Sequence, residues 1–313
     1  MDTRGLVHRS APVAARQVAD GDAESVTDEP ALADSVRLAR GCWGRPAEVE
    51  ELALRCALLL ETSADDTVVV GTTAARLHEL WLPSLPDEVH LAPAVPGISG
   101  TAMTRTRRPE IRAHRRQLPT TDVLMIDGVP TTTMARTWRD LAPLLDLPSL
   151  VAAGDSVLRA GVTSDELAEV LARTGRHAGI GRARAALSLL DGRSRSRPES
   201  HLRVAASAPD LPRFEVNEPV HRSDGGWLAE PDLSLAEAKI ALEYQGADHA
   251  EVGRMRKDIT RSTDMRRDRW VVIEYGPAEV FGRPQLIAPE LRLLVRERAP
   301  HLLRPRHRRR LVT

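Results

Sequence analysis

The chain has 313 residues, a length that predicts two domains, and its 42% hydrophobic and 28% charged residues are typical of a globular protein. Its 44 basic and 44 acidic residues cancel, so the net charge gives no general attraction to nucleic acid. Two cysteines, Cys42 and Cys56, exclude a disulfide framework, and no apolar run approaches the roughly 20 residues of a membrane-spanning helix.

The first part of the chain predicts a flexible leader followed by a small α+β region. Residues 1–35 are polar, acidic and rich in Ala, and they lack a sustained apolar period. They show no signal-peptide pattern, which together with the few cysteines favours a cytoplasmic location without membrane contact. An amphipathic helix is predicted over 46–61, a buried strand over 68–70 and a second helix over 72–82.

The segment 73–80 reads TAARLHEL, and apolar runs after it predict strands and then a helix. These runs are VHL at 89–91, IRAH at 111–114, VLMIDGVP at 123–130 and TMARTWRDLA at 133–142. Over 65–145 the chain resembles antitoxins of the AbiEi type, which belong to bacterial abortive-infection toxin–antitoxin systems. The resemblance implies an antitoxin-like α+β domain over 36–145, with a protein partner of the toxin–antitoxin type. The winged helix-turn-helix that such antitoxins often carry has no recognisable counterpart in residues 1–45.

Two other features of this region have ordinary interpretations. His78, His90 and His114 lack the ligand spacing of a zinc site, so we expect surface or core residues. A basic stretch over 105–116 is interpreted first as a solvated loop and strand face, with phosphate contact as the alternative.

Residues 146–197 predict a helical connector between the two domains. Helices are expected over 147–159, 164–172 and 183–190. The polar run at 191–197 reads DGRSRSR, and it marks the predicted domain boundary.

Residues 198–300 predict a mixed sheet flanked by helices, and a basic tail follows over 301–313. A helix begins at Pro198, where an acid in the first turn complements the helix dipole. Further elements are expected in chain order: strands at 226–235 and 238–245, a basic amphipathic helix at 251–269, a buried strand at 270–275, and closing helices from 277 that end with one at 286–298.

The two strands at 226–235 and 238–245 carry the chemistry of this region. Their short connection at Ala236 and Glu237 predicts an antiparallel hairpin. If Asp232 lies opposite Glu243, two acids converge on one face, and alternation of side chains places Gln245 on the same face. Two close carboxylates repel each other unless a cation lies between them, and hard oxygen ligands suit Mg²⁺ or Mn²⁺.

Several short motifs occur in order in this part of the chain. They are PES at 198–200, PD at 231–232, EYQG at 243–246, His249, and RDRWVV at 267–272. With this set, about a third of the chain resembles the PD-(D/E)xK nuclease superfamily, and more closely the DUF559 proteins, relatives of the very-short-patch-repair endonucleases. The resemblance implies an α/β fold with a restriction-endonuclease-like mixed sheet. The chain has Gln245 where the superfamily motif has a lysine, and an amide carries no charge and takes no proton from water at neutral pH.

The resemblance also implies roles for individual residues. Asp232, Glu243 and the backbone carbonyl of Tyr244 would hold the metal. Glu199 would reach a second metal or orient a water, Gln245 would position water, and His249 would act as general acid or base. Either of the two lysines, Lys239 and Lys257, would replace the missing charge. Basic residues of the 251–269 helix would contact DNA, with Arg254, Lys257 and Arg261 facing the site.

Two functions follow from these patterns. The first is a metal-dependent endonuclease that hydrolyses DNA phosphodiesters in DNA repair or phage defence. The second is a non-catalytic, antitoxin-like regulator that binds DNA or a protein through a vestigial nuclease fold. A purely structural interpretation also stands, in which Asp232 caps a turn and Glu243 pairs with Arg254 or Arg256.

Overall fold

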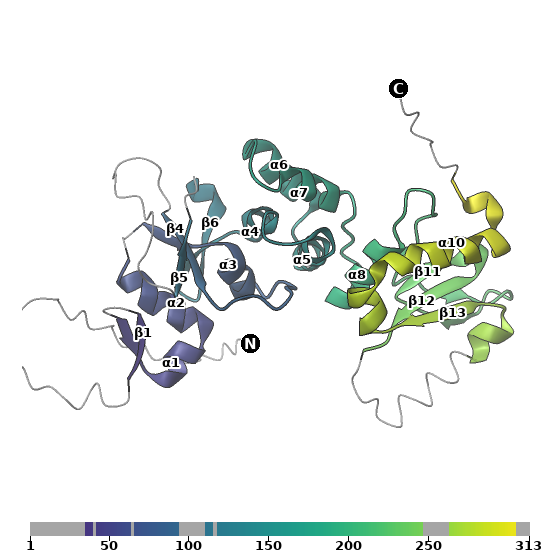
Figure 1. The fold of residues 1–313 in the computed structure, drawn as a ribbon, viewed down its shortest axis with the longest axis horizontal. Helices are drawn as coiled ribbons and strands as arrows, with labels where there is room; N and C mark the ends of the chain where they lie inside the picture. The colour runs from purple at the N-terminus through teal and green to yellow at the C-terminus, as the bar shows by residue number, and fades with distance from the viewer. Residues whose placement is uncertain are drawn as a thin grey trace, which may run out of the picture. The chain divides into compact units, whose positions relative to one another are not determined.

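The computed structural model describes residues 35–39, 42–63, 66–93, 110–114, 118–246 and 263–304. By its internal contacts the chain divides into two units, one formed by 1–79 and 84–140 and the other by 80–83 and 141–313 (Figure 1). Both units are mixed α/β with sheets flanked by helices, which confirms the predicted fold class. The predicted leader over 1–34 and the tail beyond Arg304 lie outside the described residues.

The first unit is built on a five-stranded sheet in the order β5-β4-β3-β7-β6. Its strands are β3 (Thr67–Val69), β4 (Val89–Pro93), β5 (Ile111–Ala113), β6 (Val123–Ile126) and β7 (Val129–Thr132), joined by helices α3 (Gly71–Leu77) and α4 (Met134–Leu141). A two-residue turn, Asp127-Gly128, has positive φ at both residues (48° and 82°), which matches the right-handed twist of the hairpin β6–β7. His78 Nε2 donates to the Thr132 carbonyl at 2.7 Å, and His90 is buried in the first unit.

A short hairpin and two helices precede this sheet. The hairpin pairs β1 (Val36–Ala39) with β2 (Cys42–Gly44) in antiparallel fashion. The single helix predicted over 46–61 is wrong, because Glu51 is extended (φ −75°, ψ 120°) and separates α1 (Pro46–Glu50) from α2 (Leu52–Glu61). The break leaves α2 free to bury Cys56 and Leu59 in the core with Val69, Leu91 and Val129, and one extended residue does not disturb the apolar pattern enough to be predicted.

The second unit begins with the helices of the predicted connector. They are α5 (Leu147–Arg159), α6 (Ser164–Arg173) and α7 (Ile180–Leu187), followed by α8 (Arg197–Ala206). The first two begin where predicted because side chains cap them: Asp146 accepts from the Ser149 amide, and Thr163 and Glu166 form a capping box. Helix α5 packs against both α7 and α8, so the connector belongs to the same unit as the C-terminal sheet.

The C-terminal sheet has four strands in the order β13-β12-β11-β8. The strands are β8 (Glu215–Val216), β11 (Leu233–Leu235), β12 (Ile240–Tyr244) and β13 (Val271–Tyr275). Only the β12–β13 pair is parallel, so the sheet is mixed, as predicted. The hairpin β11–β12 is confirmed, although its connection is a 3₁₀ turn (Ala236–Ala238) followed by Lys239 in the left-handed region (φ 52°).

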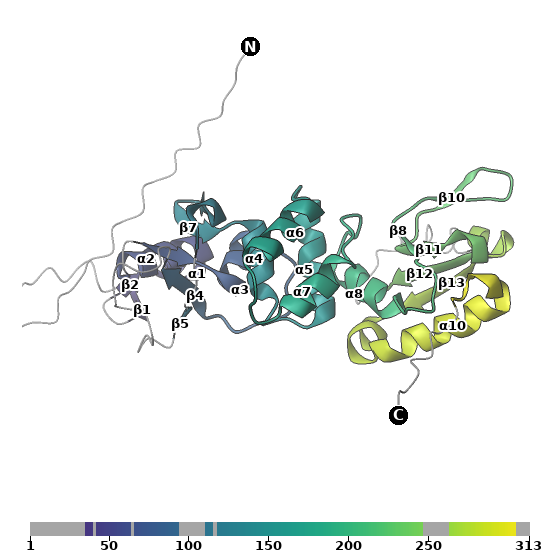
Figure 2. The ribbon, with the colours of Figure 1, turned by 90° about the horizontal axis from the view of Figure 1, so that it is seen from above.

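The strand predicted over 226–235 is two strands in different sheets. Trp227–Ala229 forms β10, which pairs with β9 (Val220–His221), whereas β11 begins only at Leu233. Pro231 lies at the break and has no N–H for a sheet ladder, which accounts for the interruption. Figure 2 shows β10 on the side of the sheet away from α10 (Ile287–Arg298).

The two faces of this sheet have different coverings. Leu202 of α8 and Leu291 and Val295 of α10 pack with Ile240 and Leu242 on one face. On the other face, Ala241 packs with Leu228 of β10, Met265 and Trp270. The remaining elements are a π-helical turn (Ala278–Gly282), 3₁₀ turns (Pro284–Leu286 and Pro300–Leu302) and a helical segment over 263–267. The rest of the predicted 251–269 helix falls in 247–262, outside the described residues.

Candidate functional site

Strand register places the two predicted acids opposite each other. In the β11–β12 hairpin Leu233 pairs with Leu242 and Ser234 with Ala241. Asp232 precedes β11 by one residue, so continuing the register aligns it with Glu243. Its side chain confirms the proximity, because Oδ2 accepts a hydrogen bond from the Tyr244 backbone N–H at 2.7 Å.

The same register decides which face the acids occupy. Side chains alternate along a strand, so Glu243 lies on the face of Ala241, which packs with Met265 and Trp270. Asp232 lies on the face of Ser234, the partner of Ala241. Both carboxylates therefore belong to the face away from α8 and α10. Glu243 is buried (7% exposed), so its charge needs compensation by donors or a cation.

A third acid, Glu274, lies beside Glu243 and was not predicted. The parallel pair β12–β13 aligns Glu243 with Glu274 and Tyr244 with Tyr275. Laterally paired residues face the same way, so Glu274 extends the row of acids to a third strand. The signal was present in the sequence: β12 reads IALEY and β13 reads VVIEY, two similar strands whose acids coincide when paired in parallel.

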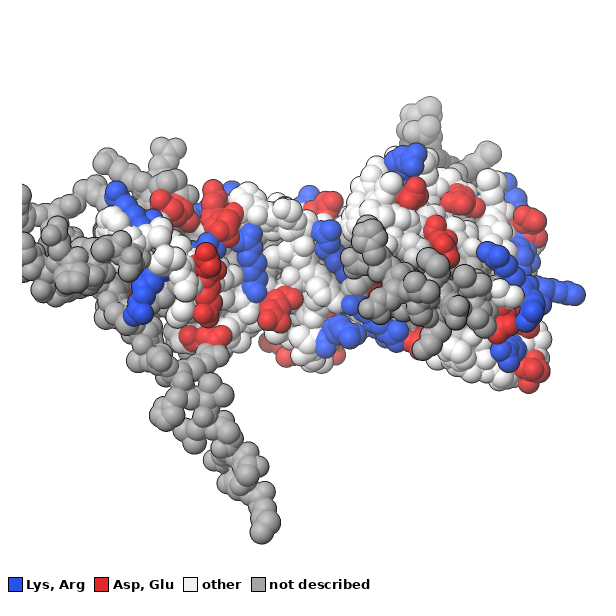
Figure 3. Space-filling view, turned by 90° about the horizontal axis from the view of Figure 1, so that it is seen from below, with Lys and Arg blue, Asp and Glu red and all other residues white. Residues whose placement is uncertain are grey.

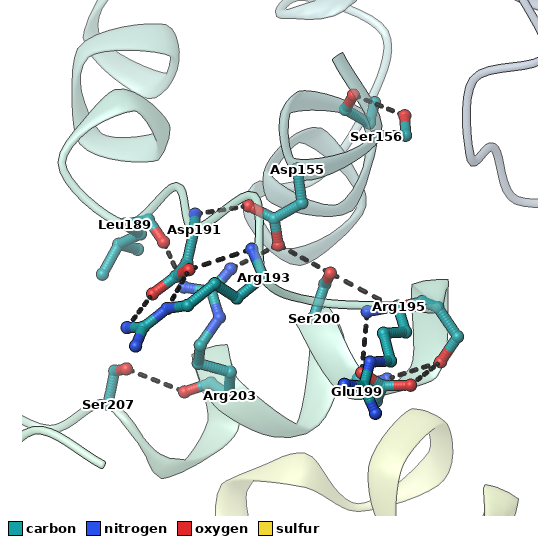
Figure 4. Close-up of polar contacts among 12 residues, drawn as sticks. Asp155, Ser156, Leu189, Asp191, Arg193, Arg195, Glu199, Ser200, Arg203 and Ser207 are labelled. Carbon is teal, nitrogen blue, oxygen red and sulfur yellow. Dashed lines mark hydrogen bonds and ion pairs between the residues drawn. The ribbon is translucent and has the colours of Figure 1, made fainter. Parts of the chain in front are cut away.

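Glu199 is close to this region but serves the start of α8. Its Oε2 accepts from the Arg195 backbone N–H at 2.8 Å (Figure 4). Its Oε1 accepts from the Ser196 hydroxyl at 2.9 Å, and Oε2 also accepts from Asn217 Nδ2 at 3.0 Å. The backbone N–H of Asn217 in turn donates to the Asp232 backbone carbonyl at 3.0 Å. Glu199 thus fixes the backbone before β11 through Asn217, while both of its own oxygens have protein donors.

Lys239, one of the two lysines expected to replace the missing charge, has other partners. Lys239 immediately precedes β12, four residues before Glu243, which is about 13 Å along a strand. Its ammonium donates to the Asp268 carboxylate at 2.8 Å, the Asp268 carbonyl at 2.7 Å and the Ser223 hydroxyl at 3.0 Å. The expectation that Lys239 supplies charge to the acids is therefore wrong. Gln245 is exposed at the end of β12, and its backbone N–H donates to the Tyr275 carbonyl at 2.9 Å.

The remaining predicted site residues lie in the segment 247–262, outside the described residues. They are His249, Arg254, Lys257 and Arg261. In the described residues that follow this segment, Arg266, Arg267 and Arg269 are exposed.

The oxygen atoms of these acids are of the chemical type that binds a hard cation. Carboxylates and the Tyr244 carbonyl are oxygen donors, which Mg²⁺ and Mn²⁺ prefer. Within the described ranges, no three His, Cys, Asp or Glu side chains gather closely enough to hold a metal. A cation at Asp232 and Glu243 would therefore complete its shell with the backbone carbonyl, water or substrate oxygens.

Two groups of the same unit, both away from the acids, have strongly lowered pKa values. The hydrogen bond from Lys239 lowers the pKa of Asp268 to about 2, and the Ser223 amide and hydroxyl add to the effect. On α8, burial together with the neighbouring Arg197 charge lowers the pKa of His201 to about 4. The His201 ring lies 4.9 Å from the Phe281 ring, and the Phe281 ring also contacts Tyr244 edge-on at 6.3 Å.

Among the described residues, the helices are all too short or too polar to cross a membrane. No family model matches the chain. It is 27% identical over 168 residues to the uncharacterized proteins MT2308 and Rv2248 of Mycobacterium tuberculosis, an alignment that covers 53% of this chain and 62% of each relative. The chain thus spans about three fifths of the length of these relatives. The crystal structure of the RV2827C protein from the same organism is similar at a TM-score of 0.35 and 16% identity, over 60% of this chain and 72% of that one, a likeness too weak to carry an argument.

Proposed function

We propose that the chain is a metal-dependent, endonuclease-like protein that hydrolyses DNA phosphodiesters in DNA repair or phage defence. One observation carries the proposal: Asp232 and Glu243 share a face of the mixed sheet, in register across a tight hairpin. Two carboxylates placed this close repel each other unless a cation lies between them, so their placement supports a metal site.

The residues of the chain have distinct tasks in this proposal. Asp232, Glu243 and the Tyr244 carbonyl would hold Mg²⁺ or Mn²⁺, which when bound supplies a nucleophilic water and neutralises phosphate charge. The hydrogen bond from the Tyr244 N–H to Asp232 positions one acid against the other strand. Gln245, exposed at the strand end, would orient water by hydrogen bonds, and His249 would move the proton.

Basic and aromatic side chains beside the same sheet face support DNA as the partner. Exposed arginines end the helical segment over 263–267, and the turn before β10 is bonded to it through Ser223 and Asp268 at 2.9 Å. Trp227 of β10 is 60% exposed in a chain with only 3% aromatic residues. Aromatic side chains interleaved with basic ones are typical of nucleic-acid surfaces. On the side of the molecule drawn in Figure 3, acidic and basic side chains are interspersed.

A specific observation also favours the alternative, a non-catalytic antitoxin-like regulator. Both oxygens of Glu199 have protein donors, and the lysine position holds Gln245. Such a protein would use the same face to bind DNA or a protein partner of the toxin–antitoxin type without cutting. Both versions of the proposal place the protein in the cytoplasm.

A cleavage assay separates the two functions. Wild-type protein should nick or cut DNA with Mg²⁺ or Mn²⁺, and Asp232→Asn should abolish cutting because loss of the metal costs several kcal/mol of transition-state stabilisation. Asp165→Asn, on the exposed surface of α6, is the matched control and should cut normally. If Gln245 limits the rate, Gln245→Lys should raise it. Inactivity of wild type and Gln245→Lys with both metals, on single- and double-stranded DNA, would leave only the regulator.

A further inference from the structure

Asn217 contacts the backbone of Asp232 from the edge strand of the C-terminal sheet. It directly follows β8, and the pairing of Val216 with Leu233 of β11, continued by one position, places Asn217 opposite Asp232. The Asn217 backbone N–H extends this ladder and donates to the Asp232 carbonyl at 3.0 Å. Asn217 has a positive φ of 47°, a conformation that Asn adopts more readily than most residues, and the strand ends there.

Asp232 is therefore held by both of its neighbouring strands. Asn217 bonds its carbonyl from the side of β8, and the Tyr244 N–H of β12 bonds its carboxylate at 2.7 Å. The two bonds act on different ends of one residue, because one fixes the main chain and the other fixes the side chain. A shift of Asn217 would move the backbone from which the Asp232 carboxylate extends.

The Asn217 side chain joins this edge of the sheet to the start of α8. Its Nδ2 donates to the Arg193 carbonyl at 2.9 Å and to Glu199 Oε2 at 3.0 Å. A carbonyl and a carboxylate both require a donor, so the amide must present its NH₂ group to them, and both protons of that group are used. Asn217 and Glu199 are each 9% exposed, so little water competes for these bonds.

Three protein donors surround the Glu199 carboxylate. Besides Asn217, the Arg195 backbone N–H donates to Oε2 at 2.8 Å, and the Ser196 hydroxyl donates to Oε1 at 2.9 Å. A buried carboxylate that is hydrogen-bonded in this way is stabilised without a cation. Glu199 is thus built into the start of α8, and Asn217 links it to the backbone of Asp232.

We propose that Glu199 is a positioning residue, which acts on Asp232 through Asn217, and that the chain holds one divalent metal rather than two. This role rests on the proposed function, because it concerns the metal site at Asp232 and Glu243. Residues that orient metal ligands change the affinity for the metal although they do not touch it. Glu199 and Asn217 would therefore affect the affinity of the site and leave the number of bound ions unchanged.

Glutamine at position 199 distinguishes a positioning residue from a metal ligand. The carbonyl oxygen of a glutamine can accept from Asn217 and from the Arg195 N–H, and its NH₂ group can donate to the Ser196 hydroxyl oxygen. All three contacts of Glu199 are then retained. A metal ligand, in contrast, would lose the negative charge that binds the ion.

The test is a titration of the full chain with Mn²⁺, in which free Mn²⁺ is measured by electron paramagnetic resonance. Wild type should bind one Mn²⁺ per chain, and Glu199→Gln should bind one with closely similar affinity. Asn217→Gly keeps the left-handed backbone conformation and removes the amide, so it should weaken binding by about tenfold or more. Glu79→Gly, at another residue with positive φ (57°) but in the first unit, is the matched control and should bind like wild type.

Two results of this titration would overturn the assignment. Two Mn²⁺ ions in wild type and one in Glu199→Gln would make Glu199 a ligand of a second metal. Equal Mn²⁺ affinities of wild type and Asn217→Gly would show that Asn217 does not position Asp232.

Hydrogen exchange of the Tyr244 amide, measured by NMR without metal, separates this role from the metal site itself. That N–H is bonded to the Asp232 carboxylate, so it should exchange about tenfold faster in Asn217→Gly than in wild type, and at an unchanged rate in Glu199→Gln. If wild type binds no Mn²⁺ but this difference is found, the proposed function fails and the positioning of Asp232 stands. Equal exchange rates in wild type and Asn217→Gly contradict the positioning, whatever the metal does.

Discussion

The Asp232 carboxylate accepts the backbone N–H of Tyr244 at 2.7 Å, at the position where the β11–β12 ladder has ended. The Asp232 carboxylate therefore takes the place of a backbone carbonyl as the acceptor for this N–H. The bond holds Asp232 beside the strand that carries Glu243. This contact also satisfies the structural interpretation, in which Asp232 supports the backbone. One oxygen in such a bond still leaves the carboxylate its charge, so support of the backbone and metal binding are compatible.

Trp227 offers a direct probe of the DNA surface. Replacing it with Ala should lower DNA affinity by about 1–3 kcal/mol if a base stacks on the ring. Its fluorescence should also be quenched on binding. Trp43, 38% exposed on β2 of the other unit, is the matched control, and Trp43→Ala should bind DNA like wild type. Equal DNA affinities of wild type and Trp227→Ala, by fluorescence anisotropy, would exclude β10 from the interface.

Lys239 should control the titration of Asp268. The pKa of that carboxyl is about 2, below its usual 3.8, so the stability from this pairing is present above pH 3.8 and is lost as the pH falls towards 2. In Lys239→Met the Asp268 pKa should rise towards 3.8, measured by NMR titration of the side-chain carboxyl. Lys239→Arg keeps a donor and should keep most of the shift. A pKa that stays near 2 in Lys239→Met would assign the effect to Ser223 instead.

His201 should make the second unit sensitive to mild acid. Its folded pKa is about 4 and its usual value 6.5, so the unfolded chain binds the proton more readily. The associated stability is fully present above pH 6.5 and falls by up to about 3 kcal/mol as the pH drops to 4. Denaturant unfolding of wild type and His201→Leu across this range isolates the effect, because other groups titrate in both. Parallel stability curves for the two proteins would show that His201 is not held neutral by the fold.

Local signals in the sequence were enough for many elements of the fold. The starts at Leu147-Pro148-Ser149 and at Thr163 to Glu166 located α5 and α6, and the apolar run before Glu243 located β12. Those signals involve only neighbouring residues, so they can be recognised without knowledge of the tertiary structure. The break at Pro231 was also visible in the sequence, yet the apolar pattern on either side of it suggested one strand.

The parts that were missed depend on contacts distant in sequence. Glu274 joins the acid row only because β13 pairs in parallel with β12, a register that periodicity does not reveal. Lys239 appeared close to the acids in sequence, but a strand carries it to the other end of the sheet, where Asp268 and Ser223 bind it. The role of Glu199 at the start of α8 likewise depends on Asn217, which is 18 residues away.

The central claim is that Asp232 and Glu243 hold a divalent metal, and Mn²⁺ anomalous diffraction tests it most directly. Crystals grown with Mn²⁺ should show one anomalous peak about 2 Å from a carboxylate oxygen of each acid, a coordination distance typical of small hard cations. Crystals of Asp232→Asn grown in the same way should lack that peak while keeping the fold. A wild-type map with no peak between the two acids at saturating Mn²⁺, or with a peak only elsewhere, would contradict the claim.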